Sequence, residues 1–419
     1  MLHRTRNTLA ALATSAAALS AAGAVTAQEV TIEYWQYFFE ARVNAMEQLI
    51  ENFEAANPNI NVEMTHFPYA DYRTRTAVAV PSGEGPDIVQ LFYGWLNDYI
   101  DEGLIQPLPV DTFSPEMVEA EFFPMVQAME RDGQYFALPT AVRSLALFYN
   151  ERILDAAGVE VPTTLDELVA AAAATTERDG AGNITQVGFT TGMTAQDHHW
   201  FREVLVRQMG GEPYTDGYQT VNYDTDAGRA ALDFYLGLEE QGVTQSGFMD
   251  EPQAAFRAGR AAFHIDGSFR IGALNGERGL QWGVTELPAN NDGVRSNYSS
   301  YWVNAITSSA EGPEYDASVL FMEYITSAEA MEIWLETVGE LPARAEVGMT
   351  EENANDPVFG PFIRGLEYAN TTIFADESAQ RQGMVDMVER VQLQDMDPGE
   401  SLTIAAEAEQ TLLNEYYSD

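Results

Sequence analysis

Residues 30–64, VTIEYWQYFFEARVNAMEQLIENFEAANPNINVEM, carry the pattern that decides the fold. Apolar side chains alternate through residues 30–35 and again through residues 60–64, as they do in half-buried β-strands. Between these segments, residues 43–53 place apolar side chains at helical spacing, and Pro58 ends the helix. A crossover of this length lets the two strands run parallel in one sheet, so the stretch predicts an α/β fold.

The same signals continue along the chain. Residues 81–92, PSGEGPDIVQLF, predict a Gly/Pro loop followed by an apolar strand that is buried on both faces. A second α/β set begins after Pro139, and Thr164 with Glu167 has the pattern of a capping box at a helix start. The further strands are predicted at residues 144–150, 184–190, 261–265, 282–288 and 300–307, and the further helices at 163–177, 199–209 and 226–242. Helical patterns dominate residues 314–335 and 376–415.

Residues 1–27 combine a short basic region with an Ala/Leu-rich stretch and a small residue at the end, which predicts a secretory signal peptide cleaved after Ala27. No later stretch approaches the ~18 consecutive apolar residues of a membrane span. The chain has no cysteine that could carry a lipid anchor. We therefore expect a protein that is free in the periplasm, and the remaining length suits two lobes joined by short segments.

The composition is strongly acidic, with 65 Asp and Glu residues against 21 basic ones and a formal net charge of −44. This charge repels DNA, RNA and anionic lipid head groups, so we expect no nucleic-acid partner. Two explanations of the charge stay open. It suits a surface adapted to salty water, and it also suits an acidic docking face or a cationic ligand.

Seven short motifs occur along residues 30–345 in the order that one known family has them. The motifs are EYW, GEGPDIVQL, GLIQPL, GQYFALPT with LFYNERILDAAGVEVPTTLDEL, FRAGRAAFHIDGSF, WGVTELP and GELPAR. With them the sequence resembles the extracellular solute-binding proteins of ABC importers, in the carbohydrate-binding, maltose-binding-protein-like branch. It departs from that family at Asp266, where Asn or a similar residue is usual, and at Phe269, where Trp is common.

The resemblance implies a two-lobed periplasmic-binding-protein fold of the α/β class, with a hinge of crossing segments and a cleft between the lobes. Its layout assigns residues 29–139 and 290–336 to lobe 1, and residues 140–289 and 337–419 to lobe 2. It further implies a monomer that captures a carbohydrate by lobe closure and delivers it to the permease subunits in the inner membrane.

Ligands of open α/β sheets bind outside the carboxyl ends of the strands. Sugars offer flat apolar faces rimmed by hydroxyl groups, so their sites need aromatic side chains together with directed hydrogen-bonding groups. Strand ends and the positions implied by the resemblance give these candidate ligand-binding residues: Trp35, Gln36, Tyr37, Phe38, Arg42, Tyr93, Trp95, Arg143, His199, Trp200, Asp266, Ser268, Phe269, Tyr298, Ser299, Tyr301, Trp302 and Arg344.

Several of these residues have a second interpretation. Each aromatic side chain after the first strand could belong to the core, and Arg143 could form a surface ion pair. Asp266 could accept hydrogen bonds from sugar hydroxyls, or it could cap the helix that begins near Ser268. Adjacent histidines diverge on a helix, so His198 and His199 make a poor metal pair. We expect no catalytic residue, no metal ligand and no cofactor.

Two other classes of function compete with sugar transport. A glycosidase needs two carboxylates at a set separation, but so many acids make chance pairs unavoidable, and no other catalytic motif is present. A transport protein could instead hold a polyamine or a quaternary amine by cation–π contacts, or ferric iron through tyrosines and His264. Arg143 and Arg344 favour a neutral or acidic sugar over these cations.

Overall fold

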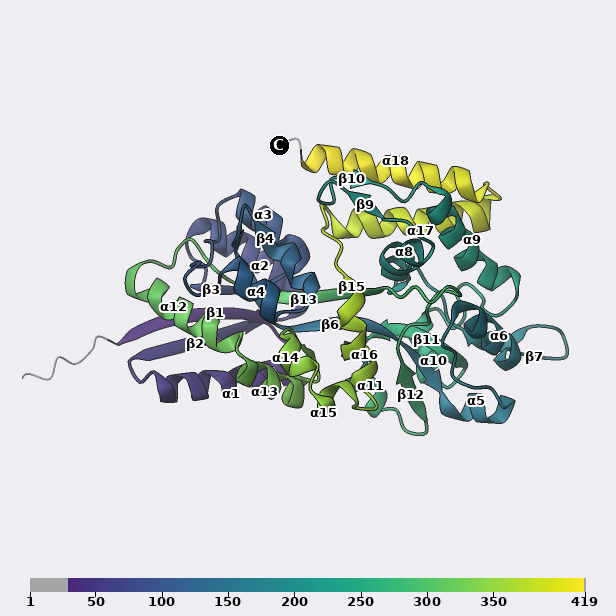
Figure 1. Ribbon diagram of the computed structural model, residues 1–419, viewed down its shortest axis with the longest axis horizontal. Coiled ribbons are helices and arrows are strands. Elements are labelled where there is room, and N and C mark those ends of the chain that lie inside the picture. The colour runs from purple at the N-terminus through teal and green to yellow at the C-terminus, as the bar shows by residue number, and fades with distance from the viewer. Residues whose placement is uncertain (1–28, 418–419) are drawn as a thin grey trace, which may run out of the picture.

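The computed structural model describes residues 29–417 (Figure 1). The predicted signal peptide lies outside these residues. One sheet runs through the molecule in the strand order β2-β1-β3-β13-β6-β11-β8-β7, and β12, β14 and β15 pair with its central strands. The strands are β1 Val30–Tyr37, β2 Ile60–Phe67, β3 Ile88–Phe92, β6 Ala137–Asn150, β7 Glu177–Arg178, β8 Ile184–Phe189, β11 Ala261–Gly267, β12 Trp282–Thr285, β13 Asn297–Ile306, β14 Leu341–Pro342 and β15 Ala369–Asn370.

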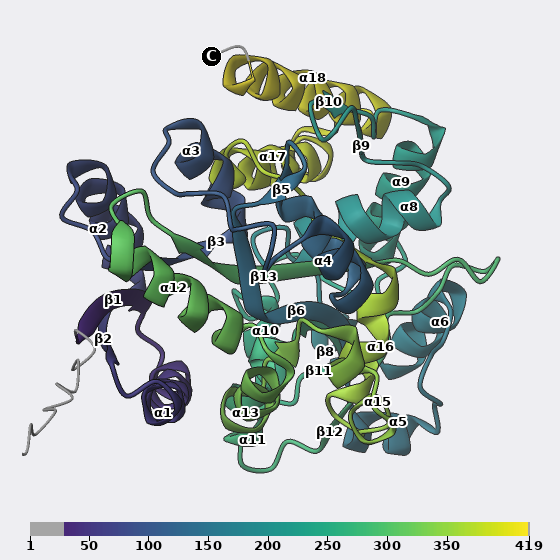
Figure 2. The ribbon, with the colours of Figure 1, turned by 60° about the vertical axis from the view of Figure 1, so that its left-hand side comes forward.

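Helices and two small hairpins surround this sheet (Figures 1 and 2). Around β1–β3 lie α1 Glu40–Ala56, α2 Tyr69–Ser82, η1 Tyr93–Trp95, α3 Leu96–Asp101, α4 Pro115–Glu121, η2 Pro124–Met129, α12 Gly312–Ile325, α13 Ala328–Val338 and the hairpin of β4 Glu130–Arg131 with β5 Gln134–Tyr135. We call this part the first lobe.

Around β8 and β11 lie the helices of the part that we call the second lobe. They are α5 Glu151–Ala157, α6 Leu165–Thr175, α7 Asp197–His199, the π-helix η3 Trp200–Leu205, α8 Val206–Gln208, α9 Asp226–Glu240, α10 Pro252–Arg257, η4 Ser268–Arg270, α11 Ile271–Asn275, α17 Glu377–Gln394 and α18 Pro398–Tyr416. The hairpin of β9 Tyr214–Thr215 with β10 Thr220–Val221 also belongs to it. Four short helices lie at the junction of the lobes, where they contact α13, β14, β6 and β13: α14 Ala345–Gly348, α15 Glu351–Ala354, α16 Gly360–Gly365 and η5 Leu366–Tyr368.

The predicted β-α-β unit is confirmed. Strand β1 pairs in parallel with β2 from Val30 opposite Ile60 to Tyr37 opposite Phe67. Helix α1 buries Met46 and Phe53, two of the apolar positions that recur at helical spacing. Burying one stripe of a helix against a sheet removes its apolar area from water, which is the main favourable contribution to folding.

The prediction that a loop begins at residue 81 was wrong. Helix α2 continues through Pro81 to Ser82, and Gly83 ends it with a φ of 72°. A proline lacks the amide that a helix needs, but in the last turn this costs little, because Gly83 and Glu84 donate to the carbonyls of Val80 and Ala79. The buried strand that follows is confirmed as β3.

The two lobes share strand β6, which is longer than the predicted strand 144–150. Its first part pairs with β13 and β14, and its second part pairs with β11 and β12. The register between β6 and β13 shifts between Trp302, opposite Ala141, and Val303, opposite Pro139, so Thr140 is an extra residue. Pro139 offers no amide to the ladder, and a bulge is where a sheet tolerates this loss.

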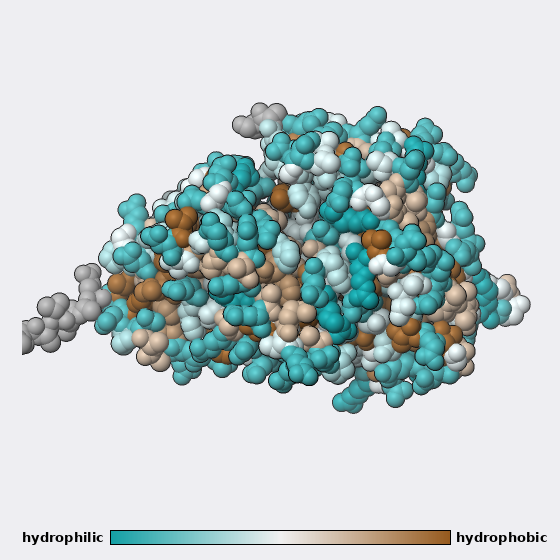
Figure 3. All heavy atoms as spheres, in the orientation of Figure 1, coloured by the Kyte–Doolittle hydropathy of each residue, from teal (hydrophilic) through white to brown (hydrophobic). Residues whose placement is uncertain are grey.

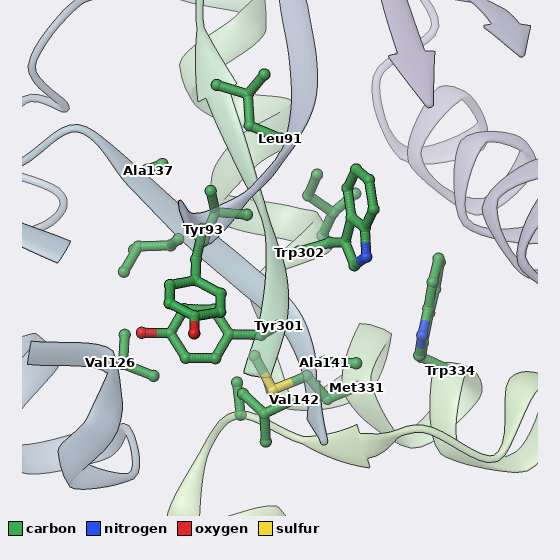
Figure 4. Close-up of a cluster of buried hydrophobic side chains, with 14 of the residues drawn as sticks. Leu91, Tyr93, Val126, Ala137, Ala141, Val142, Tyr301, Trp302, Met331 and Trp334 are labelled. Atoms are coloured by element: carbon green, nitrogen blue, oxygen red, sulfur yellow. The ribbon is translucent and has the colours of Figure 1, made fainter. Parts of the chain in front are cut away.

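Aromatic side chains fill the region where β13 crosses between the lobes (Figure 4). Tyr301 and Trp302 point to opposite sides of the strand, and Tyr301 packs on Tyr93 at a centroid distance of 4.8 Å. The buried core around them continues from the first lobe across the crossing strands. A second core fills the second lobe. The face of the molecule in Figure 3 is mostly hydrophilic, with apolar residues scattered over it.

In the second lobe the predicted capping box is confirmed, because Glu167 N–H donates to the Thr164 hydroxyl and Thr164 N–H donates to the Glu167 carboxylate. Residues 199–209 are helical as predicted, but Trp200–Leu205 form a π-helical turn. Side-chain periodicity cannot reveal such a turn, since the extra residue in it changes the spacing only locally.

Gly188 of β8 gives a test of this packing. A Cβ atom on Gly188 would lie 1.9 Å from the carbonyl oxygen of Ala172 in α6, whereas one on Gly180 would meet nothing within 4 Å. We expect Gly188→Ala to lower the free energy of unfolding by about 1–3 kcal/mol, because helix and strand must separate. Gly180→Ala is the control, and thermal denaturation measures both. Equal stability of the two variants would contradict the close packing of β8 against α6.

Candidate functional site

A cavity of about 620 Å³ lies at the junction of the two lobes. The end of β1 and the residues after it contribute Tyr37 and Phe39, and β6 contributes Arg143. The second lobe contributes Ser268 and Phe269, which follow the carboxyl end of β11. The lining also includes residues of α11, the end of α13 with the following turn, α15, and Asp356 and Phe359. The volume falls within the range of about 300–1,000 Å³ that is typical of small-molecule sites.

Four of the residues predicted from the sequence therefore meet at this cavity: Tyr37, Arg143, Ser268 and Phe269. Strand geometry explains the meeting. Tyr37 is the last residue of β1, and Ser268 and Phe269 come directly after Gly267, the last residue of β11. The carboxyl ends of strands from both lobes thus open into one space, as expected for a ligand site of α/β sheets.

A buried charge cluster forms the back of the cavity. Glu340 accepts hydrogen bonds from Arg143 Nε at 2.9 Å, from Arg42 Nη1 at 3.3 Å and from Trp334 Nε1 at 3.0 Å. The hydroxyl of Tyr37 accepts from Arg42 at 2.5 Å and from Arg143 at 3.0 Å. Four crossing or neighbouring elements are thereby tied together, and the guanidinium of Arg143 is held in a fixed orientation beside the cavity.

The electrostatics of this cluster follow from its burial and its pairing. Burial alone would raise the pKa of Glu340, but Arg143 and Arg42 outweigh it and lower that pKa to about 2. Burial alone would lower the pKa of Arg143, but Glu340 raises it above the ordinary value of an arginine. Both groups are therefore charged over the whole physiological pH range.

Aromatic rings cover the first-lobe side of the cleft. The Tyr37 ring lies 4.4 Å from the Trp302 ring and 5.6 Å from the Tyr69 ring. Tyr69 is 62% exposed, so its ring is open to solvent. Across the cleft, Phe269 is 36% exposed, and the guanidinium of Arg143 lies 5.4 Å from its ring. Partly exposed rings on both lobes are what a sugar ring needs for stacking.

A second group of predicted residues meets further along the crossing strands. The hydroxyls of Tyr93 and Tyr298 lie 2.8 Å apart, and the His199 ring stacks on Tyr298 with centroids 3.7 Å apart. Phe374 lies between His199 and Tyr93, at 5.9 and 6.3 Å from their rings. Burial lowers the pKa of His199 well below its ordinary value, and Arg202 adds to the effect, so the imidazole is neutral.

Asp266 faces the interior of the second lobe and not the cavity. The side chain is 2% exposed, and its oxygens accept from Gly267 N–H at 2.8 Å and from Arg270 Nε at 2.6 Å, while His264 Nε2 lies at 3.2 Å. Burial would raise its pKa, but His264 and Arg270 outweigh burial and lower it. The carboxylate accepts from the backbone of the turn that leads to Phe269, but η4 has no side-chain cap bond, so Asp266 does not cap the helix that begins near Ser268.

Trp200 and Arg344 also lie away from the cavity. Trp200 is 0% exposed and packs in the second core against Phe189 and Tyr235, because the helix turns it inward. Arg344 forms an ion pair with Glu121 and donates to the carbonyl of Thr326. No sequence signal shows whether a tryptophan near a helix start, such as Trp200, or an arginine near a crossing segment, such as Arg344, lies in the core or at a cleft.

The other predicted residues are distributed around the cavity. Arg42 and Trp302 lie directly behind it, and Phe38 is exposed beside His66. Gln36, Ser299 and Tyr301 are buried, and Trp35 packs edge-on against Phe67. Trp95 lies 5.3 Å from Trp302 and lines a second cavity.

Among the residues that sequence reasoning missed are Phe39 and Glu340, which line the cavity, and Tyr69, whose ring packs against Tyr37 beside it. Tyr69 begins helix α2, which the pattern did not predict. Glu340 belongs to the motif GELPAR, from which only Arg344 was selected. The available signal was the single acid of this motif, Glu340, between a glycine and a leucine. A buried acid needs a buried cation as its partner, so this acid could have been paired with an arginine.

Within residues 29–417, no group of three or more His, Asp or Glu side chains is arranged to hold a metal ion. Over the same residues, no helix combines the length and the apolar character that crossing a bilayer requires.

Glu340 gives a test of the charge cluster. Its pKa in the folded protein, about 2, lies below the ordinary 4.5, so its ionisation stabilises the fold above about pH 5, and this contribution is lost as the pH falls toward 2. We expect Glu340→Gln to lower the free energy of unfolding at pH 7 by about 3 kcal/mol. The difference from the wild type should shrink below pH 5. Denaturant titrations over a pH series measure it, with the exposed Glu352→Gln as control.

A constant difference between wild type and Glu340→Gln from pH 7 to pH 2.5 would contradict the assignment of a paired, ionised Glu340.

Comparison with known proteins agrees with this architecture. The model of the bacterial extracellular solute-binding protein family matches residues 48–361. The maltotriose-binding protein of Pyrococcus abyssi is 24% identical over 343 residues, which are 80% of this chain and 71% of that protein. The GacH receptor of Streptomyces glaucescens, solved unliganded and with acarbose, has a TM-score of 0.74 at 25% identity, covering 93% of this chain and 100% of that one.

The cyclic α-maltosyl-1,6-maltose binding protein of Arthrobacter globiformis has a TM-score of 0.80 at 19% identity, covering 92% of this chain and 99% of that one. These likenesses confirm the predicted two-lobed fold. Since the family model also matches most of the chain, the chain belongs to the bacterial extracellular solute-binding proteins.

Proposed function

We propose that this protein is the substrate-binding component of an ABC importer and that it captures a carbohydrate in the cleft between its lobes. One observation carries the proposal: Tyr37 and Arg143 line the same cavity as Phe269, which comes from the opposite lobe. Rings from both lobes can stack on a sugar, while the guanidinium offers directed donors to its hydroxyls. The names of the compared proteins, which refer to maltotriose, acarbose and a cyclic maltosyl sugar, support the same ligand class.

The mechanism is binding coupled to closure, without chemical change of the ligand. A ligand that touches both lobes binds the closed form more tightly than the open form and shifts the population toward closure. The crossing strands β6 and β13 remain paired and act as the hinge. We propose the lobe boundaries expected from the sequence, namely residues 29–139 with 290–336 and residues 140–289 with 337–419.

The closed form then delivers the sugar to the permease subunits in the inner membrane. We place this step in the periplasm, with a monomeric protein released from a signal peptide over residues 1–27. Membership in an extracellular solute-binding family supports the compartment. A binding protein needs no catalytic residues, so the proposal assigns none.

An amine ligand is the second candidate, because acids line the cavity beside the aromatic rings. Glu336, Glu352 and Asp356 contribute carboxylates to it, in addition to Glu340. Rings and acids together can surround a cation. Against this, Glu340 is neutralised by two arginines, and Asp356 accepts from the amides of Val358 and Phe359.

A thermal-shift screen separates the candidates. Neutral oligosaccharides, uronic acids, polyamines and quaternary amines are added to the purified protein, and the ligand class that raises the melting temperature identifies the function. We expect a stabilising sugar and no stabilising amine. Incubation followed by recovery of the sugar unchanged distinguishes binding from hydrolysis.

Phe269 is the residue to substitute once a sugar is found. We expect Phe269→Ala to weaken binding about tenfold, because losing a stacked ring costs roughly 1.4 kcal/mol. Titration calorimetry measures the dissociation constant. The control is Leu320→Ala, which removes an exposed apolar side chain from α12. Unchanged affinity in Phe269→Ala would exclude this ring from the site.

A further inference from the structure

The negative charge of the chain is divided almost evenly between the two lobes. At the proposed boundaries, the first lobe carries 27 acids and 5 arginines, and the second carries 38 acids and 14 arginines, which give formal net charges of −22 and −24. Charges of one sign repel, and a net charge this far from zero raises the free energy of a compact arrangement. Closing the cleft therefore brings two strongly negative bodies together.

Ion pairs between the lobes do not offset this repulsion at the cleft, because they lie next to the segments that cross between the lobes. They pair Arg42 with Glu340, Arg344 with Glu121 and Arg295 with Glu286. Glu340 and Arg344 flank β14, and Arg295 precedes β13. These pairs support the hinge and leave the facing surfaces of the lobes negative.

Acids from both sides of the proposed boundary line the cavity at Phe269. Glu336 near the end of α13 belongs to the first lobe, and Glu352 of α15 falls on the second-lobe side of the boundary. Both line the cavity of about 620 Å³, and neither forms a hydrogen bond or an ion pair within residues 29–417. Closure around an uncharged ligand therefore leaves two unpaired carboxylates beside one space.

Away from the hinge, the lobes meet where the end of α18 approaches α3 (Figure 2). The hydroxyl of Tyr416 donates to Asp98 at 3.1 Å, and Asp98, Asp101 and Glu102 line a cavity of about 790 Å³ beside Tyr416. Of these three acids, Asp101 pairs with Arg131 of its own lobe. The C-terminal end of a helix carries a partial negative charge, and α18 has four glutamates but no arginine. A negative helix end therefore faces a group of carboxylates.

Asp98 shows how crowded the negative charge is at this contact. Burial raises its pKa, the Tyr416 hydroxyl and Arg73 lower it, and Glu102 and Asp101 raise it again, so that the pKa lies above its ordinary value. A raised pKa means that the closed arrangement disfavours the charged form of this carboxyl group.

Salt sets the distance over which these repulsions act. Exposed charges interact over about 30 Å at 0.01 M salt and over about 3 Å at 1 M salt. The closed form holds the acids of both lobes closer together than the open form does. Screening therefore lowers the free energy of the closed form more than that of the open form.

We propose that ionic strength governs the closure of the lobes, and that repulsion opposes closure chiefly at the contact between α18 and α3. This inference deepens the proposed function and rests on it. At low salt the repulsion favours the open form, and screening allows the closed form that holds the ligand. The affinity for an uncharged sugar therefore rises with the salt concentration.

Calorimetric titration of the full protein with maltotriose tests this inference, because maltotriose has no charge and salt then acts on the protein. The titrations run in NaCl, KCl and tetramethylammonium chloride from about 0.01 M to about 1 M. Each series starts at the lowest concentration at which circular dichroism shows a folded chain. X-ray scattering of the ligand-free protein over the same series, extrapolated to zero protein concentration, measures the radius of gyration.

Two matched double variants locate the effect. Asp98→Asn with Glu102→Gln removes two charges from the α3 side of the contact and keeps an oxygen that accepts from Tyr416. Glu47→Gln with Glu51→Gln removes two charges from exposed positions of α1, which lies on the side of the first lobe away from α18 (Figures 1 and 2). The two variants thus change the net charge equally.

We expect the wild type to bind maltotriose about tenfold more tightly at the highest salt concentration than at the lowest, and to become more compact as the salt concentration rises. The three salts should act equally, since screening depends on ionic strength alone. The α3 variant should bind more tightly than the wild type at low salt and show a salt dependence of about threefold. The α1 variant should follow the wild type.

An affinity and a radius of gyration that do not change with salt would overturn the inference and leave the proposed function standing. Equal salt dependence in the two double variants would overturn it as well, and so would an effect of one cation alone, which indicates a bound ion in place of screening. If no sugar of the thermal-shift screen binds at any salt concentration, the proposed function fails, and the scattering data then decide whether salt closes the lobes.

Discussion

Strand β6 must satisfy its backbone hydrogen bonds in two lobes at once, and the rest of the structure depends on this. Its first part is a member of the first lobe's sheet, and its second part is the centre of the second lobe's sheet. Buried amide and carbonyl groups that lack partners cost free energy, so the strand cannot detach from either lobe. The lobes are thus parts of one sheet, and any relative motion has to occur as bending or twisting of β6 and β13.

The charge cluster around Glu340 lies beside β6, the strand that the two lobes share. Arg143 projects from β6, Arg42 from α1, and Glu340 follows α13, so one carboxylate connects the hinge with two first-lobe helices. Removing charges from water is costly, and the cost is offset here by several hydrogen bonds to each group. The same pairing orients Arg143 toward the cavity, so a structural interaction also sets the geometry of the proposed site.

Local patterns predicted most of the elements, and long-range packing determined what they missed. The alternation around Val30 and Ile60, and the capping box at Thr164, depend on nearby residues, and the structure confirms them. Helix α2 was missed because its apolar positions are weakly periodic and Pro81 suggested a loop. Of the predicted site residues, Tyr37 at the end of β1, Arg143 within β6, and Ser268 and Phe269 after β11 line the cavity. Trp200 and Asp266 do not, because Trp200 packs against Tyr235 from a distant helix, and the nearby His264 and Arg270 hold the Asp266 carboxylate inside the second lobe.

The extra residue Thr140 has a consequence for the direction of Arg143. Successive side chains of a strand point to opposite faces of the sheet. An inserted residue therefore moves every side chain beyond it to the opposite face. With Thr140 in place, residues 137–139 before the bulge and residues 141–144 after it both pair with β13. Deleting Thr140 would change no side chain around the cleft chemically. Even so, Arg143 and residues 137–139 of β6 could no longer both keep the faces that they have now.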